Sequence, residues 1–237
     1  YGVAYFAQEM LRHKGDSLAG KTCIISGAGN VGIYTMEKLT QLGAKVVGFM
    51  DYDGSIYDEH GIDEERLAYL KELVFVRRGS LKDYDKKFHG AHFRAGKKTW
   101  DIPCDYAFPT ACENELDGQD AQQLIANGCK GVCEGSNMPC TPEAIERIKA
   151  AKLLYSPGKA SNAGGVAVSG LEMTQNSMRI YWTREEVEKY LQRIMNSIHQ
   201  NCLEAAAMYG MTGDYMAGAN IFGFKKVADA MIDQGLV

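Results

Sequence analysis

The sequence predicts an α/β fold: a doubly wound, mostly parallel sheet with helices on both faces and a C-terminal helical extension. Three observations lead to this prediction. A strand pattern, a glycine-rich turn, a helical pattern and a second strand follow one another within residues 22–51. Strand and helix patterns then alternate with short connections as far as residue 155, which is typical of a parallel sheet. From residue 166 onward the apolar periodicity is helical only.

Composition excludes several classes of protein. The chain is 46% hydrophobic and 24% charged, which is ordinary for a globular domain. Its net charge is −4 and it has no long basic run, so we expect no nucleic-acid partner. It has no apolar stretch of about 18 residues, so we expect no membrane span.

The cysteines indicate a reducing compartment. There are seven, an odd number without a framework pattern, so we expect free thiols and a cytoplasmic location. Cys129 and Cys133 are separated by three residues, with Cys140 nearby, a spacing that a metal site could use. The pair brackets a predicted strand and has no His close by, so we interpret these residues as small and buried and predict no metal site.

In the first half of the chain the predicted elements come in this order. A helical pattern covers residues 3–14, and because the chain does not begin with Met we interpret it as a piece of a longer protein. A strand at 22–26, a helix ending at Leu42 and a strand at 45–50 follow. A short extended segment is expected at 56–57 and a helix over 63–73, capped by Asp63. An apolar run occupies 73–76, and residues 82–100 read as polar and irregular.

The second half continues the alternation and then changes. Strands are predicted at 106–109, 131–134 and 153–155, with helices at 119–126 and 141–151 between them. Helices at 166–181, 183–208 and 219–233 complete the chain, the second opened by a capping box of Thr183 and Glu186. We therefore predict a nucleotide-binding domain over residues 1–165, including the N-terminal helix. A helical segment over 166–237 is expected to pack back on it.

The glycine-rich turn predicts a Rossmann-like dinucleotide site. Gly27 allows a tight turn, Gly29 lets the backbone approach a diphosphate, and Gly32 lets helix and strand pack closely. The start of the following helix offers unpaired N–H groups and a positive dipole end to the phosphates. Asp51 follows Gly32 by 19 residues, where an acidic side chain is expected to bind the ribose hydroxyls.

Small polar loops follow three later strands, and each carries an asparagine: Asn114, Asn137 and Asn162. The carboxyl ends of parallel strands form the ligand-binding edge of such sheets. An amide both donates and accepts, which suits a nicotinamide carboxamide and ribose hydroxyls. A single loop asparagine is commonly a turn former, but three at successive strand ends favour cofactor lining. Ser169, in the first turns of the next helix, either meets an anion there or faces solvent.

With these residues established, the chain resembles the nucleotide-binding domain of hexameric-type glutamate dehydrogenases over essentially its whole length. The resemblance rests on SGAGNVG (26–32), NEL (114–116), LIANG.K (124–130) and EGSNMP (134–139). The most specific segments are NAGGVAVSGLEMTQN (162–176) and GANIFGFKKVADAM (218–231).

The resemblance implies oxidative deamination of L-glutamate to 2-oxoglutarate and ammonia, and the reverse amination, with hydride passing to or from a nicotinamide. It implies that Val166 and Ser169 meet the glutamate side chain, with Ser169 hydrogen-bonding the far carboxylate. The residues that it assigns to the coenzyme are Gly27, Gly29, Asn30, Val31 and Gly32 at the diphosphate, Asp51 and Tyr52 at the adenosine ribose, Arg77 at its phosphate, Asn137 and Asn162 near the nicotinamide, and also Ala111 and Asn114.

The same resemblance implies what this chain lacks. The family's catalytic lysine and its partner aspartate belong to an N-terminal domain, for which we find no match here. No catalytic residue is therefore predicted in this chain, which should hold coenzyme but catalyse nothing alone. Its expected partners are its own N-terminal domain and the other subunits of a homo-hexamer. Two departures from the family pattern lie near the coenzyme: Cys112-Glu113, where relatives often have Thr-Gln, and Ser136, where many have Ala.

The choice of coenzyme depends on two residues. Asp51 by itself favours NAD, because a carboxylate repels a 2′-phosphate. NADP-using members resemble this chain in keeping that aspartate, and Arg77 matches a basic residue that meets the phosphate. We favour NADP, with NAD or dual use remaining open. The alternative for Arg77 and Arg78 is a solvated pair.

Two other functions remain open. A leucine- or phenylalanine-type dehydrogenase shares the glycine turn but needs an apolar floor for the side chain, and Ser169 and the long C-terminal helices argue against it. A non-catalytic module that senses NAD(P)H would need a partner-recognition element, and we see none in the sequence.

Overall fold

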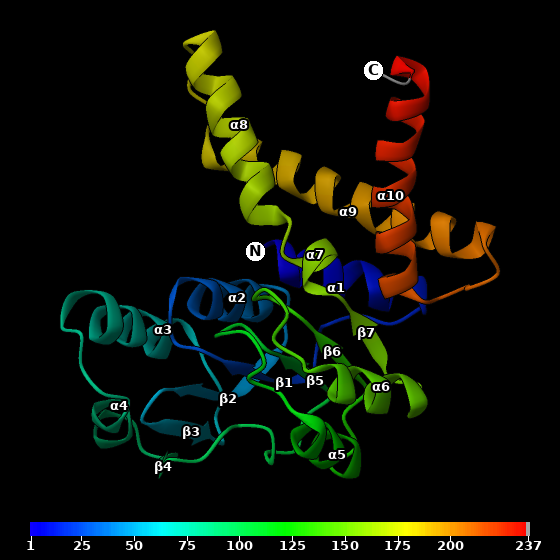
Figure 1. Ribbon diagram of the computed structural model, residues 1–237. Coiled ribbons are helices and arrows are strands. Elements are labelled where there is room, and N and C mark those ends of the chain that lie inside the picture. Colours follow the sequence, from blue (N-terminus) through cyan, green and yellow to red (C-terminus); the bar gives the residue numbers. More distant parts are fainter. Residues whose placement is uncertain (236–237) are drawn as a thin grey trace.

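A computed structural model of the chain describes residues 1–235. Within them one seven-stranded sheet has the order β4-β3-β2-β1-β5-β6-β7 (Figure 1). Strands β2, β1, β5, β6 and β7 are parallel, and β3 and β4 add an antiparallel edge, so the predicted mostly parallel sheet is confirmed. The strands are β1 Thr22–Ser26, β2 Lys45–Asp51, β3 Gly54–Asp58, β4 Ala91–Ala95, β5 Tyr106–Phe108, β6 Gly131–Cys133 and β7 Leu154–Ser156.

Helices cover both faces of the sheet. One hydrophobic core lies under α1 and α2, and a second lies under α5 and α6 on the opposite face (Figure 1). The helices are α1 Gly2–His13, α2 Asn30–Gln41, α3 Glu64–Lys71, α4 Lys82–Lys87, α5 Gly118–Ala126, α6 Pro142–Ala150, α7 Gly158–Ser161, α8 Gly164–Met178, α9 Arg184–Met208 and α10 Tyr215–Gln234, with a π-helix, η1 Glu72–Val76, after α3.

The central strand β1 shows why its sequence is a continuous apolar run. Successive side chains of a strand point to opposite faces. Cys23 and Ile25 belong to the core under α1 and α2, whereas Ile24 belongs to the core under α5 and α6. All three are fully buried, so both faces of β1 are covered by apolar packing at these positions.

The prediction that residues 82–100 are irregular was wrong, because they contain α4 and β4. Strand β4 pairs only with β3, at the edge of the sheet, and its sequence AHFRA is partly exposed. AHFRA alternates apolar and polar residues, but it is only five residues long and Phe93 is its one large apolar side chain, so the strand signal is weak. The apolar run 73–76 is the π-helix η1, closed by a hydrogen bond from the Arg77 N–H to the Glu72 carbonyl at 3.0 Å.

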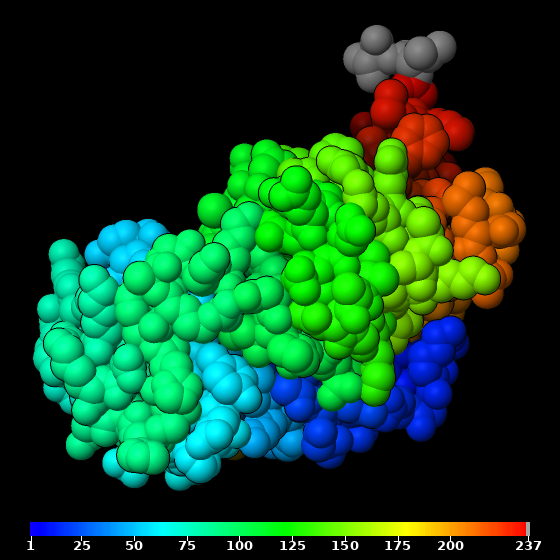
Figure 2. Space-filling view, turned by 90° about the horizontal axis from the view of Figure 1, so that it is seen from below, coloured from blue at the N-terminus to red at the C-terminus, as the bar shows by residue number. Residues whose placement is uncertain are grey.

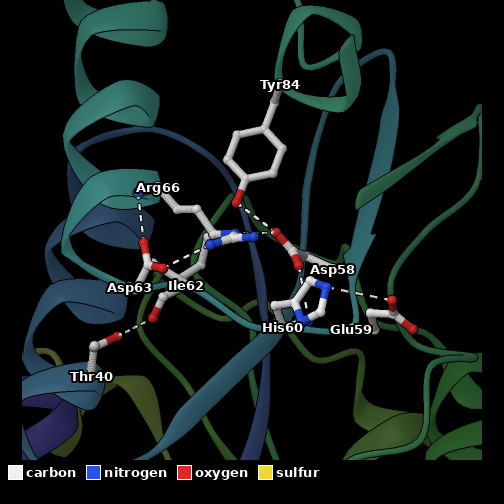
Figure 3. A network of polar contacts seen from close by, with 8 residues as sticks. All are labelled: Thr40, Asp58, Glu59, His60, Ile62, Asp63, Arg66 and Tyr84. Carbon is white, nitrogen blue, oxygen red and sulfur yellow. Dashed lines mark hydrogen bonds and ion pairs between the residues drawn. The ribbon is translucent and has the colours of Figure 1, made fainter. Parts of the chain in front are cut away.

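A buried aspartate fixes the antiparallel edge to its helices (Figure 3). Asp58, at the end of β3, is fully buried and accepts hydrogen bonds from Arg66 Nε and the Tyr84 hydroxyl, both at 2.9 Å. The backbone N–H of His60 donates to it at 3.0 Å. Asp63 caps α3 as predicted, accepting from the Arg66 N–H at 2.8 Å. The carboxylate of Asp58 is thus well paired, as a buried charge must be.

The predicted C-terminal helices are confirmed as α8, α9 and α10, and the capping box of Thr183 and Glu186 is present. Helix α9 packs on α1, while α8 and α10 extend away from the sheet (Figure 1). The far end of α10 projects beyond the rest of the molecule (Figure 2). The boundary predicted between residues 165 and 166 falls inside the first turn of α8.

Helices α1 and α8 approach each other backbone to backbone at Gly2 and Gly164. A Cβ built on Gly2 would lie 2.8 Å from the Cα of Gly164, and one built on Gly164 would lie 2.7 Å from the Cα of Gly2. Neither position has room for a side chain without moving one helix. The start of α8 is therefore seated directly on the start of α1.

All seven cysteines are free thiols, and six of them, including Cys129, Cys133 and Cys140, are buried. Cys112 is the exposed one. Within residues 1–235 no helix combines the length and the apolar character needed to cross a membrane.

A buried histidine lies where α1, α9 and α10 meet. The side chain of His199 is almost fully buried, its Nε2 lies 2.9 Å from the Tyr215 hydroxyl, and its ring packs against Phe6 and His13. Burial and the charge of His13 lower the pKa of His199 to about 4. The folded chain therefore keeps this imidazole neutral at pH values where the unfolded chain protonates it.

This pKa predicts acid destabilisation that depends on one residue. The pKa of His199 is lowered from 6.5 on folding, so stability is lost as the pH falls below 6.5 towards 4. Between pH 7.5 and 5.0 this site should remove about 2 kcal/mol from the free energy of unfolding. His199→Gln should abolish that part of the loss in urea unfolding, whereas His89→Gln, at an exposed site, should not. If the free energy of unfolding depended equally on pH in wild type, His199→Gln and His89→Gln, His199 would not be the source of the loss.

Candidate dinucleotide-binding site

The turn after β1 requires glycine at two of its positions. Gly27 has a φ of +76°, in the left-handed region, and a Cβ there would lie 3.0 Å from the Cα of Ala111. A Cβ at Gly32 would lie 1.7 Å from the Gly27 carbonyl oxygen. The turn therefore packs against its own helix and against the turn after β5, as the sequence predicts for Gly27 and Gly32.

Helix α2 begins immediately after this turn with an uncapped N-terminus. Its N-cap is Gly29, no side chain caps it, and its first turn contains no acidic residue. A Cβ at Gly29 would meet no atom within 4 Å, so the space in front of the helix is open. The N–H groups of a helix's first turn have no partner within the helix and attract anions.

A cleft of about 940 Å³ lies at the carboxyl ends of the parallel strands. It brings together three turns and the start of α8. Its lining residues are Val31, Thr110, Ala111, Cys112, Glu113, Gly135, Ser136, Asn137, Asn162, Gly165, Val166 and Ser169. Six of the predicted site residues are among them: Val31, Ala111, Asn137, Asn162, Val166 and Ser169. Thr110 and Gly135 were not predicted as site residues. Each follows the end of a strand, but no sequence pattern distinguishes it from an ordinary loop residue.

Two of the predicted asparagines are hydrogen-bonded to each other in the lining of the cleft. Asn162 Nδ2 donates to Asn137 Oδ1 at 2.8 Å and to the Ser136 carbonyl at 3.4 Å. Asn137 is exposed and Asn162 partly so, and both line the cleft. Their amides therefore present donors and acceptors to any molecule bound there.

A buried carboxylate holds these asparagines in place. Glu134 follows β6, and its carboxylate accepts from the Gly158 N–H at 2.6 Å, the Tyr155 hydroxyl at 2.8 Å and the Cys140 N–H at 3.4 Å. Ser161 donates to its carbonyl. Burial near this carboxylate raises the pKa of Tyr155. Glu134 thus ties the loop that carries Asn137 to α7, which leads into Asn162.

Asp51 and Tyr52, which were predicted to contact the adenosine ribose, lie outside this cleft at the end of β2. Asp51 Oδ1 accepts from the Tyr52 N–H at 2.9 Å, and the side chain of Tyr52 is 92% exposed. Arg77 lies over the ring of Tyr69 at 4.8 Å and pairs with Glu72 at 3.5 Å.

The segment after η1 lies beside the turn between β2 and β3. Ser80 Oγ donates to Asp53 Oδ2 at 2.5 Å. This contact links the segment that follows Arg77 to the turn that follows Asp51. The two regions predicted to meet the adenosine end of a coenzyme are therefore neighbours.

Asn114 is separate from the other two asparagines. It has a φ of +55° and lines a neighbouring cavity of about 600 Å³, which shares Glu113 and Asn137 with the main cleft. Its N–H donates to the Met138 carbonyl at 3.0 Å. In this structure Asn114 therefore joins two loops rather than facing the main cleft.

The far wall of the cleft is the first part of α8. Val166 is 79% exposed and Ser169 is also exposed, so both side chains are free to meet a ligand. Gly165 stands between them and α7, with open space where its Cβ would be. Within residues 1–235 no cluster of His, Cys, Asp and Glu side chains is arranged to hold a metal ion.

The parallel sheet, the glycine turn that opens a helix and the cleft at the strand ends define a Rossmann-like α/β domain. The chain belongs to the glutamate/leucine/phenylalanine/valine dehydrogenase family, whose family model matches residues 1–235.

Individual relatives narrow the comparison. Over its full length the chain is 52% identical to the glutamate dehydrogenase of Bacteroides thetaiotaomicron and to the NADP-specific glutamate dehydrogenase of Haemophilus influenzae. A structure of Plasmodium falciparum glutamate dehydrogenase 2 matches 99% of this chain with a TM-score of 0.97 and 45% identity. The chain spans 53% of each bacterial protein and 52% of the Plasmodium chain, so it corresponds to about half of each relative.

The geometry of the turn predicts that two alanine substitutions differ in their effect on the free energy of unfolding. Gly32→Ala should lower the free energy of unfolding by about 2 kcal/mol or more, because its Cβ overlaps the Gly27 carbonyl. Gly29→Ala should change it by less than about 1 kcal/mol, because that Cβ meets open space. Urea unfolding of both variants measures the difference. A similar loss in both would show that the turn packs differently.

Proposed function

We propose that this chain is the coenzyme-binding part of a glutamate dehydrogenase. The whole enzyme would convert L-glutamate, NAD(P)⁺ and water to 2-oxoglutarate, ammonia and NAD(P)H, with NADP favoured. The observation that carries the proposal is one cleft that is lined by Val31 of α2, by the Asn137–Asn162 pair and by the start of α8. The names of the 52% identical relatives support the reaction.

The residues present fit a nicotinamide dinucleotide. The open space before Gly29 and the uncapped start of α2 suit its diphosphate, held by the amides of residues 29–32. The amides of Asn137 and Asn162 suit the nicotinamide and its ribose, with Ala111 on the turn after β5. Asn114, on the same turn, lines the neighbouring cavity and would act through the position of its loop. A coenzyme held there would supply hydride transfer, while the residues of the cleft would bind and orient it.

On that wall we propose the contacts to substrate. The hydroxyl of Ser169 donates a hydrogen bond to the far carboxylate of glutamate, and Val166 packs against the side-chain methylenes. A hydrogen bond to a charged group is worth about 1.5–3 kcal/mol, enough to decide between a carboxylate and an apolar side chain. A leucine-type substrate would leave this hydroxyl without a partner.

The catalytic groups belong, in this proposal, to a further domain of the whole enzyme that supplies a lysine and an aspartate. We propose that residues 1–165 form the coenzyme domain and that 166–237 reach towards that partner domain. Support comes from the apolar side chains that α8 and α10 expose, including Met173, Phe224 and Ile232. A homo-hexamer in a reducing cytoplasm completes the proposal, the free thiols being consistent with that compartment.

For the coenzyme we propose NADP. Arg77 follows a π-helix whose Arg77–Glu72 hydrogen bond fixes its backbone, and its neighbour Ser80 contacts the turn after Asp51. A guanidinium near that turn offsets the repulsion between Asp51 and a 2′-phosphate.

Arg77→Gln should weaken NADPH binding at least tenfold and NADH binding less than twofold, because only NADPH carries the 2′-phosphate. Fluorescence titration of the chain with each reduced coenzyme measures both. Arg78→Gln, at the exposed neighbouring position, is the matched control and should leave the ratio unchanged. Wild-type chain that binds neither coenzyme would overturn the proposed function itself, whereas an unchanged ratio in Arg77→Gln would overturn only the assigned role of Arg77.

In the whole enzyme, Ser169→Ala should raise the KM for glutamate at least tenfold and the KM for coenzyme less than threefold, because one charge-assisted hydrogen bond is lost. Steady-state assays on glutamate, with leucine as an alternative substrate, provide the test. Ser177→Ala, exposed further along α8, is the control. Equal changes in both KM values would show that Ser169 does not meet the substrate.

A further inference from the structure

A buried carboxyl group lies beneath the two turns that face the cleft. Glu115 is only 8% exposed, although the four residues before it, 111–114, are all exposed. Its Oε1 accepts hydrogen bonds from Ser26 Oγ at 2.7 Å and from the Ala111 N–H at 3.0 Å. Ser26 is the last residue of β1 and Ala111 belongs to the turn after β5. One carboxyl oxygen therefore joins the ends of two adjacent strands.

Ser26 also forms hydrogen bonds directly with the turn after β5. The Thr110 N–H donates to Ser26 Oγ at 2.7 Å, and the Thr110 hydroxyl donates to the Ser26 carbonyl. The next residue, Gly27, already lies against Ala111. From outside, Lys98 Nζ donates to the main-chain carbonyl of Glu115 at 2.9 Å. The turn at 27–32 and the turn at 110–113 are thus joined directly by Ser26 and Thr110, and a second time through the carboxylate of Glu115.

This arrangement has a cost. The second oxygen, Oε2, is buried and has no hydrogen-bond partner within residues 1–235. Burial raises the pKa of Glu115 above its ordinary value, because the charged form is poorly solvated. Such a group weakens the fold compared with an apolar residue of similar size. Its hydrogen bonds therefore point to precise placement of the turns rather than to stability.

We propose that Glu115 is a positioning residue that sets the distance between the diphosphate-binding turn and the turn that lines the nicotinamide side of the cleft. The proposal rests on the proposed coenzyme site. A dinucleotide must contact both turns at once, so its affinity depends on their separation. A ligand that contacts only the adenosine end, such as 2′,5′-ADP, does not depend on that separation.

The test compares Glu115→Ala and Glu115→Gln with wild-type chain in titrations with NADPH and with 2′,5′-ADP. Glu115→Ala should weaken NADPH binding at least tenfold and 2′,5′-ADP binding less than threefold. Glu115→Gln should restore NADPH binding to within about threefold of wild type, because its amide oxygen can accept both hydrogen bonds. Glu146→Ala, an exposed glutamate on α6, is the control and should bind both ligands like wild type.

Ser26→Ala provides an independent variant if Glu115→Ala does not fold. It removes the hydroxyl that bridges the two turns and should show the same selective loss for NADPH. Equal losses for NADPH and 2′,5′-ADP would assign Glu115 a general structural role and overturn the proposal. So would unchanged NADPH binding in Glu115→Ala, or a Glu115→Gln variant as weak as Glu115→Ala. Wild-type chain that binds neither ligand would instead overturn the coenzyme site.

Discussion

The contact between Gly32 and the carbonyl of Gly27 is the constraint on which the candidate site depends. Because residue 32 is a glycine and has no Cβ, α2 can begin shortly after the end of β1 and lie close to the sheet. Its uncapped N-terminus then faces the edge where β5 and β6 also end. A side chain at position 32 would displace α2, and the amides that suit a diphosphate would move away from the cleft.

Buried acceptors then hold the neighbouring turns together. Parallel strands bond to each other along their length, but the turns that follow them receive no such ladder. Glu115 joins the turns after β1 and β5, and Glu134 joins the loop after β6 to the segment after β7. The rim of the cleft is therefore built from side-chain hydrogen bonds to main-chain N–H groups, and the sheet alone does not determine its shape.

The parts of this fold that the sequence predicts are those with local requirements. Ile24 and its neighbours read as a strand because both faces of β1 are buried, and Gly27 and Gly32 stand out because the turn admits no side chain. Strand β4 was missed because its alternation spans only five residues and includes a single large apolar side chain, Phe93. The roles of Glu115 and Glu134 were missed for a different reason. A charged residue becomes buried only through partners such as Ser26 and Tyr155, which are distant in sequence and unrelated to local pattern.

The glycine contact between α1 and α8 links the width of the cleft to the first residues of the chain. Gly164 rests on Gly2, and Val166 and Ser169 follow it within the next two turns of the helix. Even a methyl group at position 2 would force the two helices apart and so move the wall that carries Val166 and Ser169. A residue that does not line the cleft therefore constrains its shape.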